Sequence, residues 1–306
     1  MSDPGWAGVL IAVLGGALRV STPFLFVSLG ECITEKSGRI NLGLEGILVM
    51  GAMAAYGVAF ETGDPWLGVL AAGGAGLLLG LLHGAICTLP RVNDIAVGIG
   101  LMLFGLGLAF FLGKPYVQPK APGLPAIPLG GWSDSPQIQS ALQVSPLFLL
   151  GLALAIALAW AFRNTRWGLV LRIVGDSSDA ARAMGYRVNL VRTLATGAGG
   201  LLAGIGGSFL SLHYPGSWSE GLSSGQGLMA VALVIFARWN PVHCFYAALL
   251  FGGASALGPA LQSVGITTGY YLFNAAPYGL TLAIMVVTCS PRRTLHGAPG
   301  ELSIVR

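Results

Sequence analysis

The chain has 306 residues, of which 54% are hydrophobic and only 9% are charged, and 47 are glycines. Soluble domains usually carry about a quarter charged residues, so this composition excludes a soluble protein and indicates an integral membrane protein. The formal net charge of +4 does not indicate a nucleic-acid partner, because the basic residues gather in loops between apolar runs, as is typical of membrane proteins.

Apolar segments recur along the whole chain, and one span of the hydrocarbon core needs about 20 such residues. We place them near residues 6–20, 22–35, 42–60, 66–89, 95–112, 147–162, 194–212, 227–237, 242–262 and 276–289. Several are too short to span the membrane alone. We therefore expect an all-α polytopic integral membrane protein, a single domain over 1–306 with roughly eight to ten transmembrane or half-membrane helices.

The first apolar segment has no basic region before it and no small-residue cleavage site after it. These two features are needed in a signal peptide. We therefore expect this segment to be retained as a helix.

A charged stretch, GECITEKSGRINLGLEGILVMGA at 30–52, interrupts the apolar sequence. Its charged and amide side chains are Glu31, Glu35, Lys36, Arg39, Asn41 and Glu45. Ionisable groups inside a membrane are costly and are usually paired or functional. Two interpretations stay open: ion pairs such as Glu35 with Arg39 clamp a broken helix at 36–41, or the polar groups line a pathway for a solute.

The loop at 163–193 carries six arginines against two aspartates, and the tail at 290–306 is also basic. Positive loops face the cytoplasm, so we place both segments there. Alternation from these two segments then predicts the sides of the other loops: 113–146, 213–226 and 263–275 outside, and 90–94 and 238–241 inside. The side of the N-terminus stays open, because the break at 36–41 lies either at mid-membrane or at the surface.

The basic loop contains the signal of a short helix. Asp176, Ser177 and Ser178 are candidate N-caps, the residues after them favour a helix, and Gly185 can end it in the left-handed conformation. Such a helix across a cytoplasmic loop is a docking device for a partner. The alternative is a solvated connector.

The predicted outer segment HYPGSWSEGLSSGQG at 213–227 combines Tyr214, Trp218 and Gln226 with several glycines and a proline. One interpretation is a re-entrant loop whose aromatic and amide groups contact a small polar solute. The other is an interfacial aromatic belt, which is common in membrane proteins.

Signatures of an enzyme, a metal site or a cofactor site are missing from the sequence. Cys32, Cys87, Cys244 and Cys289 are widely spaced in apolar surroundings and fit packing residues. Ser255 in GGASALG lacks a nearby base, which a serine nucleophile needs. No GxxxxGK[ST] motif for ATP occurs. We therefore expect no catalytic residue, no metal and no cofactor in this chain.

Three motifs together resemble one family. They are ECITEKSGRINLGLEGILVMGA near the start, GLVLRIVGDSSDAARAMGYRVNLVR in the middle and GQGLMAVALVIFARWNP toward the end, and they cover residues 20–290 in the family's order. The chain is similar to permease subunits of bacterial ABC importers of the branched-chain amino acid and simple-sugar superfamily. Within it, EKSGRINLGLEG, with Glu45 where other branches carry small residues or histidine, resembles the nucleoside branch, which is linked to basic membrane lipoproteins.

This resemblance implies an importer that works by alternating access in the bacterial cytoplasmic (inner) membrane. A separate ATPase subunit would bind ATP and Mg²⁺, a second and longer permease subunit would complete the pathway, and a lipoprotein or periplasmic receptor would deliver the solute. Membrane lipid would surround the chain. A sugar or branched-chain amino acid permease, and a self-sufficient proton-coupled transporter that uses the buried glutamates, are the alternatives.

The resemblance also assigns residues to two sites. We expect a substrate pathway that includes Glu31, Asn41, Glu45, Phe209, Tyr214, Trp218 and Gln226. We expect the loop helix to couple to the ATPase through Asp176, Ser178, Asp179, Ala181, Arg182, Met184 and Gly185. The sequence GDSSDAA departs from the family's usual Asn-Pro there, and the Asp and Ser caps can replace the stiff start that proline provides.

Overall fold

The computed structural model describes residues 5–117, 119–263, 269, 272–273, 275–288 and 297–304. Cys289, His296 and much of the predicted tail at 290–306 lie outside this part of the chain. Seven of the described helices are long and apolar enough to cross a membrane. They are α1 (Gly5–Lys36), α2 (Leu44–Thr62), α3 (Pro65–Ile86), α4 (Asp94–Gly113), α6 (Pro146–Asn164), α9 (Val188–Leu212) and α11 (Pro241–Ser263).

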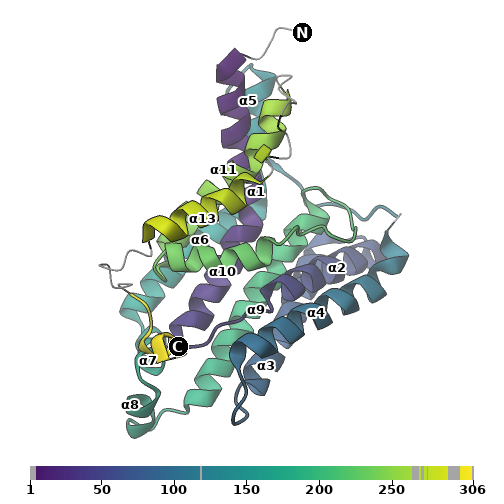
Figure 1. Ribbon diagram of the computed structural model, residues 1–306. Helices are drawn as coiled ribbons and strands as arrows, with labels where there is room; N and C mark the ends of the chain where they lie inside the picture. The colour runs from purple at the N-terminus through teal and green to yellow at the C-terminus, as the bar shows by residue number, and fades with distance from the viewer. Residues whose placement is uncertain are drawn as a thin grey trace.

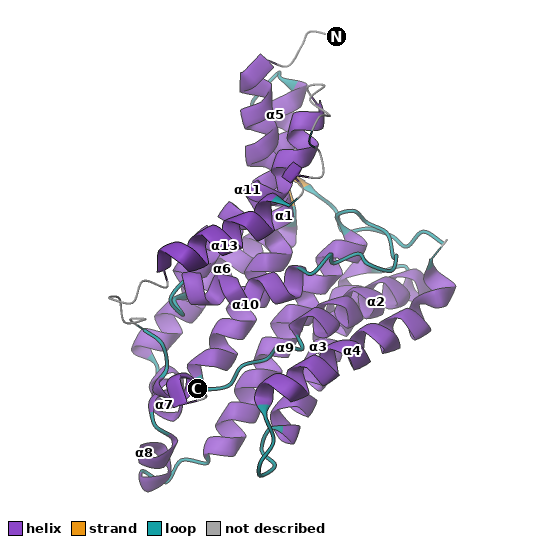
Figure 2. Ribbon diagram, viewed as in Figure 1, coloured by secondary structure: helices purple, strands orange, loops and turns teal. Residues whose placement is uncertain are grey.

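Shorter elements complete the described fold (Figures 1 and 2). They are η1 (Lys114–Tyr116), α5 (Pro136–Ala141), α7 (Arg166–Asp176), α8 (Ser178–Ala183), α10 (Gln226–Phe236), α13 (Ala276–Thr288) and α14 (Gly300–Ile304). Strands β1 (Ile127–Pro128) and β2 (Gln143–Val144) form one antiparallel pair. The predicted all-α polytopic class is confirmed.

Helix α1 joins two apolar segments that the sequence analysis kept apart, 6–20 and 22–35. Arg19, Ser21 and Thr22 lower the hydropathy between them, and Pro23 removes one backbone donor, yet the helix continues through all four. Ser21 satisfies itself locally, because its hydroxyl donates to the carbonyl of Leu18 at 3.3 Å. Hydroxyl side chains and neighbouring helices let membrane helices tolerate such interruptions.

Glycines let the backbones of α3 and α9 touch. A Cβ at Gly76 would lie 2.1 Å from the carbonyl oxygen of Gly200, and a Cβ at Gly204 would lie 2.1 Å from that of Ala72. Small residues of this kind allow the close helix approach that holds membrane bundles together. These two helices therefore form one rigid backbone-to-backbone pair.

The loops fall into two groups at opposite ends of the helices. One end, here named the α8 end, contains the connector 37–43, the α3–α4 turn and α7–α8. Two contacts join these segments: Arg39 pairs with Asp94, and Arg192 donates to the carbonyl of Ser37 at 3.0 Å. At the other end, Tyr56 donates to the carbonyl of Pro119 and Leu124 donates to that of Leu212. The loops at 37–43, 90–94 and 163–193 thus lie at one end and those at 113–146 and 213–226 at the other, while most of 263–275 lies outside the described residues. Which end faces the cytoplasm stays a prediction.

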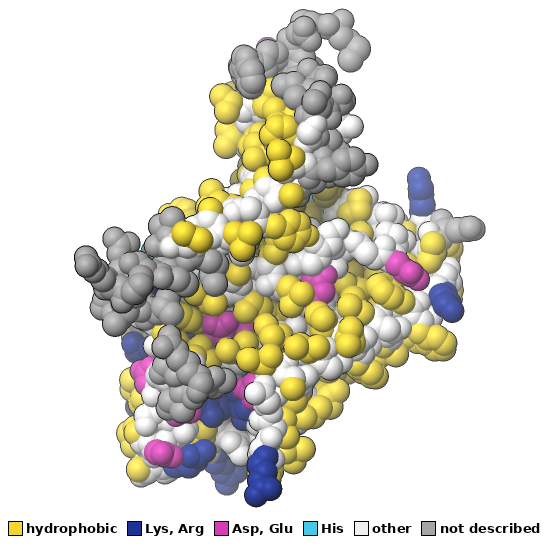
Figure 3. All heavy atoms as spheres, viewed as in Figure 1, with side chains coloured by type: hydrophobic (Ala, Val, Ile, Leu, Met, Phe, Trp, Pro, Cys, Tyr) yellow, Lys and Arg dark blue, Asp and Glu magenta, His cyan; other side chains and the backbone are white. Residues whose placement is uncertain are grey.

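The charged break is therefore a connector between two helices that starts at the α8 end. It then enters the bundle, because a Cβ at Gly46 would lie 2.5 Å from the carbonyl of Met102, more than two turns into α4. Figure 3 shows apolar side chains over the middle of the visible face and basic side chains gathered at its lower end, around α8 and the α3–α4 turn.

Candidate functional site

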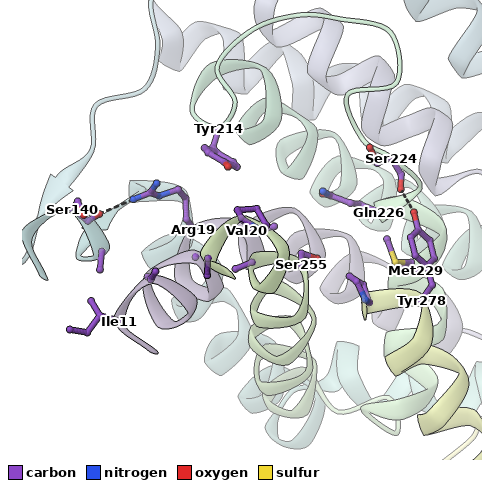
Figure 4. A pocket seen from close by; sticks show the side chains of 18 residues that line it. Ile11, Arg19, Val20, Ser140, Tyr214, Ser224, Gln226, Met229, Ser255 and Tyr278 are labelled. Atoms are coloured by element: carbon purple, nitrogen blue, oxygen red, sulfur yellow. Dashed lines mark hydrogen bonds between the residues drawn. The ribbon is translucent and has the colours of Figure 1, made fainter. Parts of the chain in front are cut away.

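A cavity of about 760 Å³ opens at the end opposite α8, which we call the outer pocket. Small-molecule sites commonly fall between about 300 and 1,000 Å³, so the cavity can hold a small solute. Its walls come from α1, α5, α10, α11, α13 and the 213–225 segment (Figure 4). The polar and aromatic side chains in the lining are Arg19, Ser140, Tyr214, Ser224, Gln226, Ser255 and Tyr278.

Two of the wall contacts are fixed by the protein itself. Arg19 donates to the carbonyl of Ser140 at 2.7 Å, and its guanidinium carbon lies 5.8 Å from the ring centroid of Tyr214, within the range of a cation–π contact. Tyr278 donates to the carbonyl of Ser224 at 2.9 Å. The aromatic rings are thus held at the pocket wall by groups from other elements.

Gln226, the first residue of α10, is the polar group best suited to bind a solute there. Its side chain lies between Tyr214 and Ser224 (Figure 4), and its buried Oε1 atom has no hydrogen-bond partner among the described residues. An unpaired buried acceptor is destabilising. The amide group of Gln226 is therefore not fully used by the described residues, and its side chain lines the pocket.

Glu45 holds Gln226 in place without lining the pocket itself. Its buried carboxylate accepts hydrogen bonds from the Ser223 hydroxyl at 2.5 Å and from the backbone N–H groups of Gly225 at 3.0 Å and Gly227 at 2.7 Å. A carboxylate at the first turn of a helix satisfies free donors and matches the helix dipole. Glu45 thus fixes the start of α10, and the pathway role predicted for it stays a prediction.

Glu31, on α1, and Asn41, in the connector, lie together and are fully buried. The backbone N–H of Asn41 donates to Glu31 Oε1 at 2.8 Å, and the side-chain oxygen of Asn41 accepts from Gly43 at 2.9 Å. The Asn41 Nδ2 atom has no partner in the described part of the chain. Glu31 Oε2 likewise has no hydrogen-bond partner among the described residues. These two predicted pathway residues are therefore brought together, with two buried polar atoms left without a partner.

The predicted ion pair between Glu35 and Arg39 is not formed. Arg39 pairs with Asp94 and donates to the carbonyl of Cys87 at 2.5 Å, whereas Glu35 accepts a hydrogen bond from the indole of Trp239. The turn after α10 therefore supplies the partner of Glu35. The expectation that charged residues close in sequence pair with each other did not predict either of these long-range contacts.

Phe209 and Trp218 lie in the core and not in the pocket lining. Phe209 is fully buried with its ring 5.1 Å from that of His213. Trp218 is 2% exposed and its ring lies 6.5 Å from that of Phe110. They shape the segment that carries Tyr214, and a role in binding solute stays a prediction.

Arg19, Ser255 and Tyr278 line the pocket although the sequence analysis did not assign them to a solute site. Arg19 had a usable signal, because it is an isolated arginine in the middle of an apolar run. Ser255 and Tyr278 had none, because a lone serine or tyrosine in a membrane helix is common.

The helix predicted in the basic loop is present as α8. The hydroxyl of Ser177 accepts from the N–H of Ala180 at 3.2 Å as an N-cap, and Gly185 follows the helix with φ +85°. Asp179 and Arg182 form an exposed ion pair at 2.8 Å. Capping thus begins at Ser177, one of the three predicted residues.

The residues assigned to coupling divide between two faces of α8. Ala181 is fully buried against Val174 and Val188, and Ser178 is 9% exposed. Met184 is 56% exposed, and Asp176, Asp179, Arg182 and Gly185 are exposed as well. A partner that docks on α8 therefore meets Met184 and the charged pair, while Ala181 fixes the helix to its own chain.

The family model described as "Branched-chain amino acid transport system / permease component" matches residues 12–289. A putative glucose ABC transporter permease of Haloferax volcanii is 34% identical over 83% of this chain and 79% of its own length. The guanosine ABC transporter permease NupQ of Bacillus subtilis is 30% identical over 90% of this chain and 91% of its own length.

The nucleoside ABC transporter permease NupC of Lactococcus lactis is 28% identical over 90% of this chain and 91% of its own length. Relatives named for different solutes thus each match more than four-fifths of this chain. The outer pocket apart from Ile11, the buried polar pair and the exposed α8 all fall within the matched region. From the family match and these identities, the chain belongs to the branched-chain amino acid transport system permease family and is an ABC transporter permease component.

Proposed function

We propose that this chain is the transmembrane permease subunit of an ATP-driven importer, and that its solute is a nucleoside. The observation that carries the proposal is the outer pocket, whose lining includes both the ring of Tyr214 and the amide of Gln226 (Figure 4). A nucleoside offers a flat base for stacking and N–H and hydroxyl donors for the amide. The relatives named for guanosine and nucleosides support this solute class.

The rest of the transporter would be supplied by separate chains. An ATPase subunit would bind ATP and Mg²⁺ and dock on the exposed face of α8, so the loop at 163–193 and the C-terminus would lie in the cytoplasm. A second, longer permease subunit would close the pathway beside this one, and a lipoprotein or periplasmic receptor would deliver the solute to the outer pocket. The host membrane would be the bacterial cytoplasmic (inner) membrane, and the cycle would be alternating access.

The test is uptake into proteoliposomes that contain the chain with its ATPase, its companion permease and its receptor. We expect uptake of labelled guanosine that needs ATP and is competed by unlabelled nucleosides but not by glucose or leucine. Competition by glucose alone would change the proposed solute to a sugar, as the glucose-permease relative suggests. Competition by leucine alone would change it to an amino acid, as the family description suggests.

Proteoliposomes also test the competing function, a self-sufficient proton-coupled transporter. The buried Glu31 and Glu35 lie one turn apart on α1, a pattern that proton-coupled transporters also use. Uptake by this chain alone, driven by a proton gradient and abolished by Glu31→Gln, would contradict the ATP-driven importer.

A further inference from the structure

A junction at the α8 end joins four segments that are far apart in sequence. Arg192, near the start of α9, donates to the carbonyl of Ser37 in the connector at 3.0 Å and to that of Val174 in α7 at 3.3 Å. Its guanidinium also forms an ion pair with Glu301 of α14 at 3.1 Å. The side chains of this pair are only 10% and 19% exposed, so solvent screens the pair less than a surface pair.

Glu301 reaches α8 with its second oxygen. The carboxylate Oε1 accepts the backbone N–H of Ser178, the first residue of α8, at 2.7 Å. That N–H is one of the donors that a helix start leaves free, and the Ser177 cap serves a different one. One carboxylate therefore links the helix that faces the partner to the arginine that holds the connector.

Close backbone contacts support the same junction independently of charge. A Cβ at Gly38 would lie 2.9 Å from the Cβ of Glu301, one at Gly175 would lie 2.1 Å from the carbonyl of Lys36, and one at Gly300 would lie 2.4 Å from that of Asp176. The end of α1, the end of α7 and α14 are thus in direct contact. A displacement of α7 and α8 is therefore transmitted to the connector by packing as well as by hydrogen bonds.

The connector leads from this junction to the pathway residues. Four residues beyond Ser37, the N–H of Asn41 donates to Glu31. Helix α2 begins at Leu44, and its second residue, Glu45, holds the start of α10. A movement of Ser37 is thus passed through one short segment to the Glu31–Asn41 pair and to Glu45.

We infer that Glu301 is a positioning residue for ATPase coupling: it latches α8 to Arg192 and so to the connector, which delivers the movement of the docked partner to the solute pathway. This inference rests on the proposed importer function. Removing the latch leaves α8 capped and exposed and leaves the packing contacts and the Arg192 hydrogen bonds in place, but it removes the direct link from α8 to Arg192. Less of the movement of α8 then reaches the connector, so more ATP is hydrolysed for each solute transported.

The test substitution is Glu301→Gln, since an amide oxygen still accepts from Ser178 while the ion pair with Arg192 is lost. Glu301→Asp keeps the charge, and Glu61→Gln makes the same chemical change at an exposed position at the opposite end. In the reconstituted complex we expect Glu301→Gln to raise the ATP hydrolysed per guanosine transported by about fivefold or more, the scale of a typical coupling energy. Glu301→Asp should recover part of the coupling and Glu61→Gln should behave as wild type.

A second measurement uses the full chain alone. Spin labels at Met184→Cys and Leu89→Cys, both exposed positions, in a cysteine-free background report the distance between α8 and the α3–α4 turn. We expect a narrow distribution that broadens in Glu301→Gln and not in Glu61→Gln. If Glu301→Gln changes neither the distance distribution nor the ATP hydrolysed per solute, the latch is overturned. If the wild-type complex shows no ATP-driven uptake, the importer function is overturned, and the distance measurement alone then decides whether the latch exists.

Discussion

Glu45 and Ser223 are 178 residues apart in sequence, yet the Ser223 hydroxyl donates a 2.5 Å hydrogen bond to the Glu45 carboxylate. All three groups around this carboxylate are donors. In Glu45→Gln, one carboxylate oxygen becomes an NH2 group that faces a donor, and the remaining amide oxygen accepts without a charge. Because hydrogen bonds to charged groups contribute about 1.5–3 kcal/mol, we expect a clear loss of thermal stability, measured on the purified chain in detergent.

Glu61→Gln is the matched control, because Glu61 is exposed and accepts only a long 3.4 Å hydrogen bond from Tyr116. Its unfolding temperature should equal that of the wild type. Equal unfolding temperatures for Glu45→Gln and Glu61→Gln would show that Glu45 does not hold the start of α10.

The contact between α3 and α9 gives a second prediction. Gly76→Ala places a methyl group 2.1 Å from the carbonyl oxygen of Gly200, so the helices have to separate. Overpacking of this kind costs about 1–3 kcal/mol. Gly74→Ala, two residues away on the same helix, meets nothing within 4 Å. We expect lower yield in the membrane and lower thermal stability for Gly76→Ala alone, and similar values for both variants would contradict the close approach.

Substitutions in α8 should separate folding from docking. Met184 is 56% exposed, whereas Ala181 is fully buried. Met184→Asp should leave the chain stable and weaken its binding to the ATPase, measured by co-purification. Ala181→Asp should destabilise the chain itself, since it buries an unpaired charge. Trp132→Asp, at an exposed position remote from α8, is the control. Equal ATPase binding by Met184→Asp and Trp132→Asp would show that α8 is not the docking surface.

Gln226 should control solute affinity without controlling the fold. Gln226→Leu keeps the size of the side chain but removes the amide from the pocket wall. Losing one neutral hydrogen bond of about 0.5–1.5 kcal/mol should raise the guanosine concentration for half-maximal uptake several-fold, while the ATPase activity without solute stays the same. Met229→Leu, a volume-conserving change on the same pocket wall, is the control. An unaltered concentration dependence in Gln226→Leu would place the solute elsewhere.

Acid should release the latch between α14 and α8. Burial raises the pKa of Glu301, but the Ser178 amide and the Arg192 guanidinium outweigh this effect, so its pKa in the folded chain lies below the ordinary value. The stabilisation is therefore present at neutral pH and is lost as the pH falls through the folded pKa. We expect the Met184–Leu89 distance distribution to broaden below about pH 4.

In Glu301→Gln the same distribution should already be broad at neutral pH and should change little on acidification. A narrow distribution at every pH in both proteins would mean that the carboxylate does not hold α8.

The membrane class and most helices could be predicted because length and hydropathy decide them. The sequence also predicted α8, since Ser177 and Gly185 act through local backbone geometry. Local signals failed where distant segments decide the outcome: α1 continues through Arg19 and Pro23 because neighbouring helices cover the interruption. Trp218 looked like a surface aromatic but is buried against Phe110.

The candidate site shows the same division. Tyr214 and Gln226 were found because aromatic and amide groups stand out in a glycine-rich segment, and both line the pocket. The positioning role of Glu45 depends on donors 178 residues away, and Glu301 acts through Arg192 and Ser178. Neither partner set has a spacing that a linear pattern can reveal.

The shortness of α10 bears on how much of the membrane remains closed to the solute. Its eleven residues rise about 16 Å, while the hydrocarbon core is about 30 Å thick. Gln226 begins the helix in the outer pocket, and the turn after it meets Glu35 near the α8 end through Trp239. On the proposed function, we therefore expect a solute held by Gln226 to be separated from the Glu35–Trp239 contact by little more than the length of this one short helix.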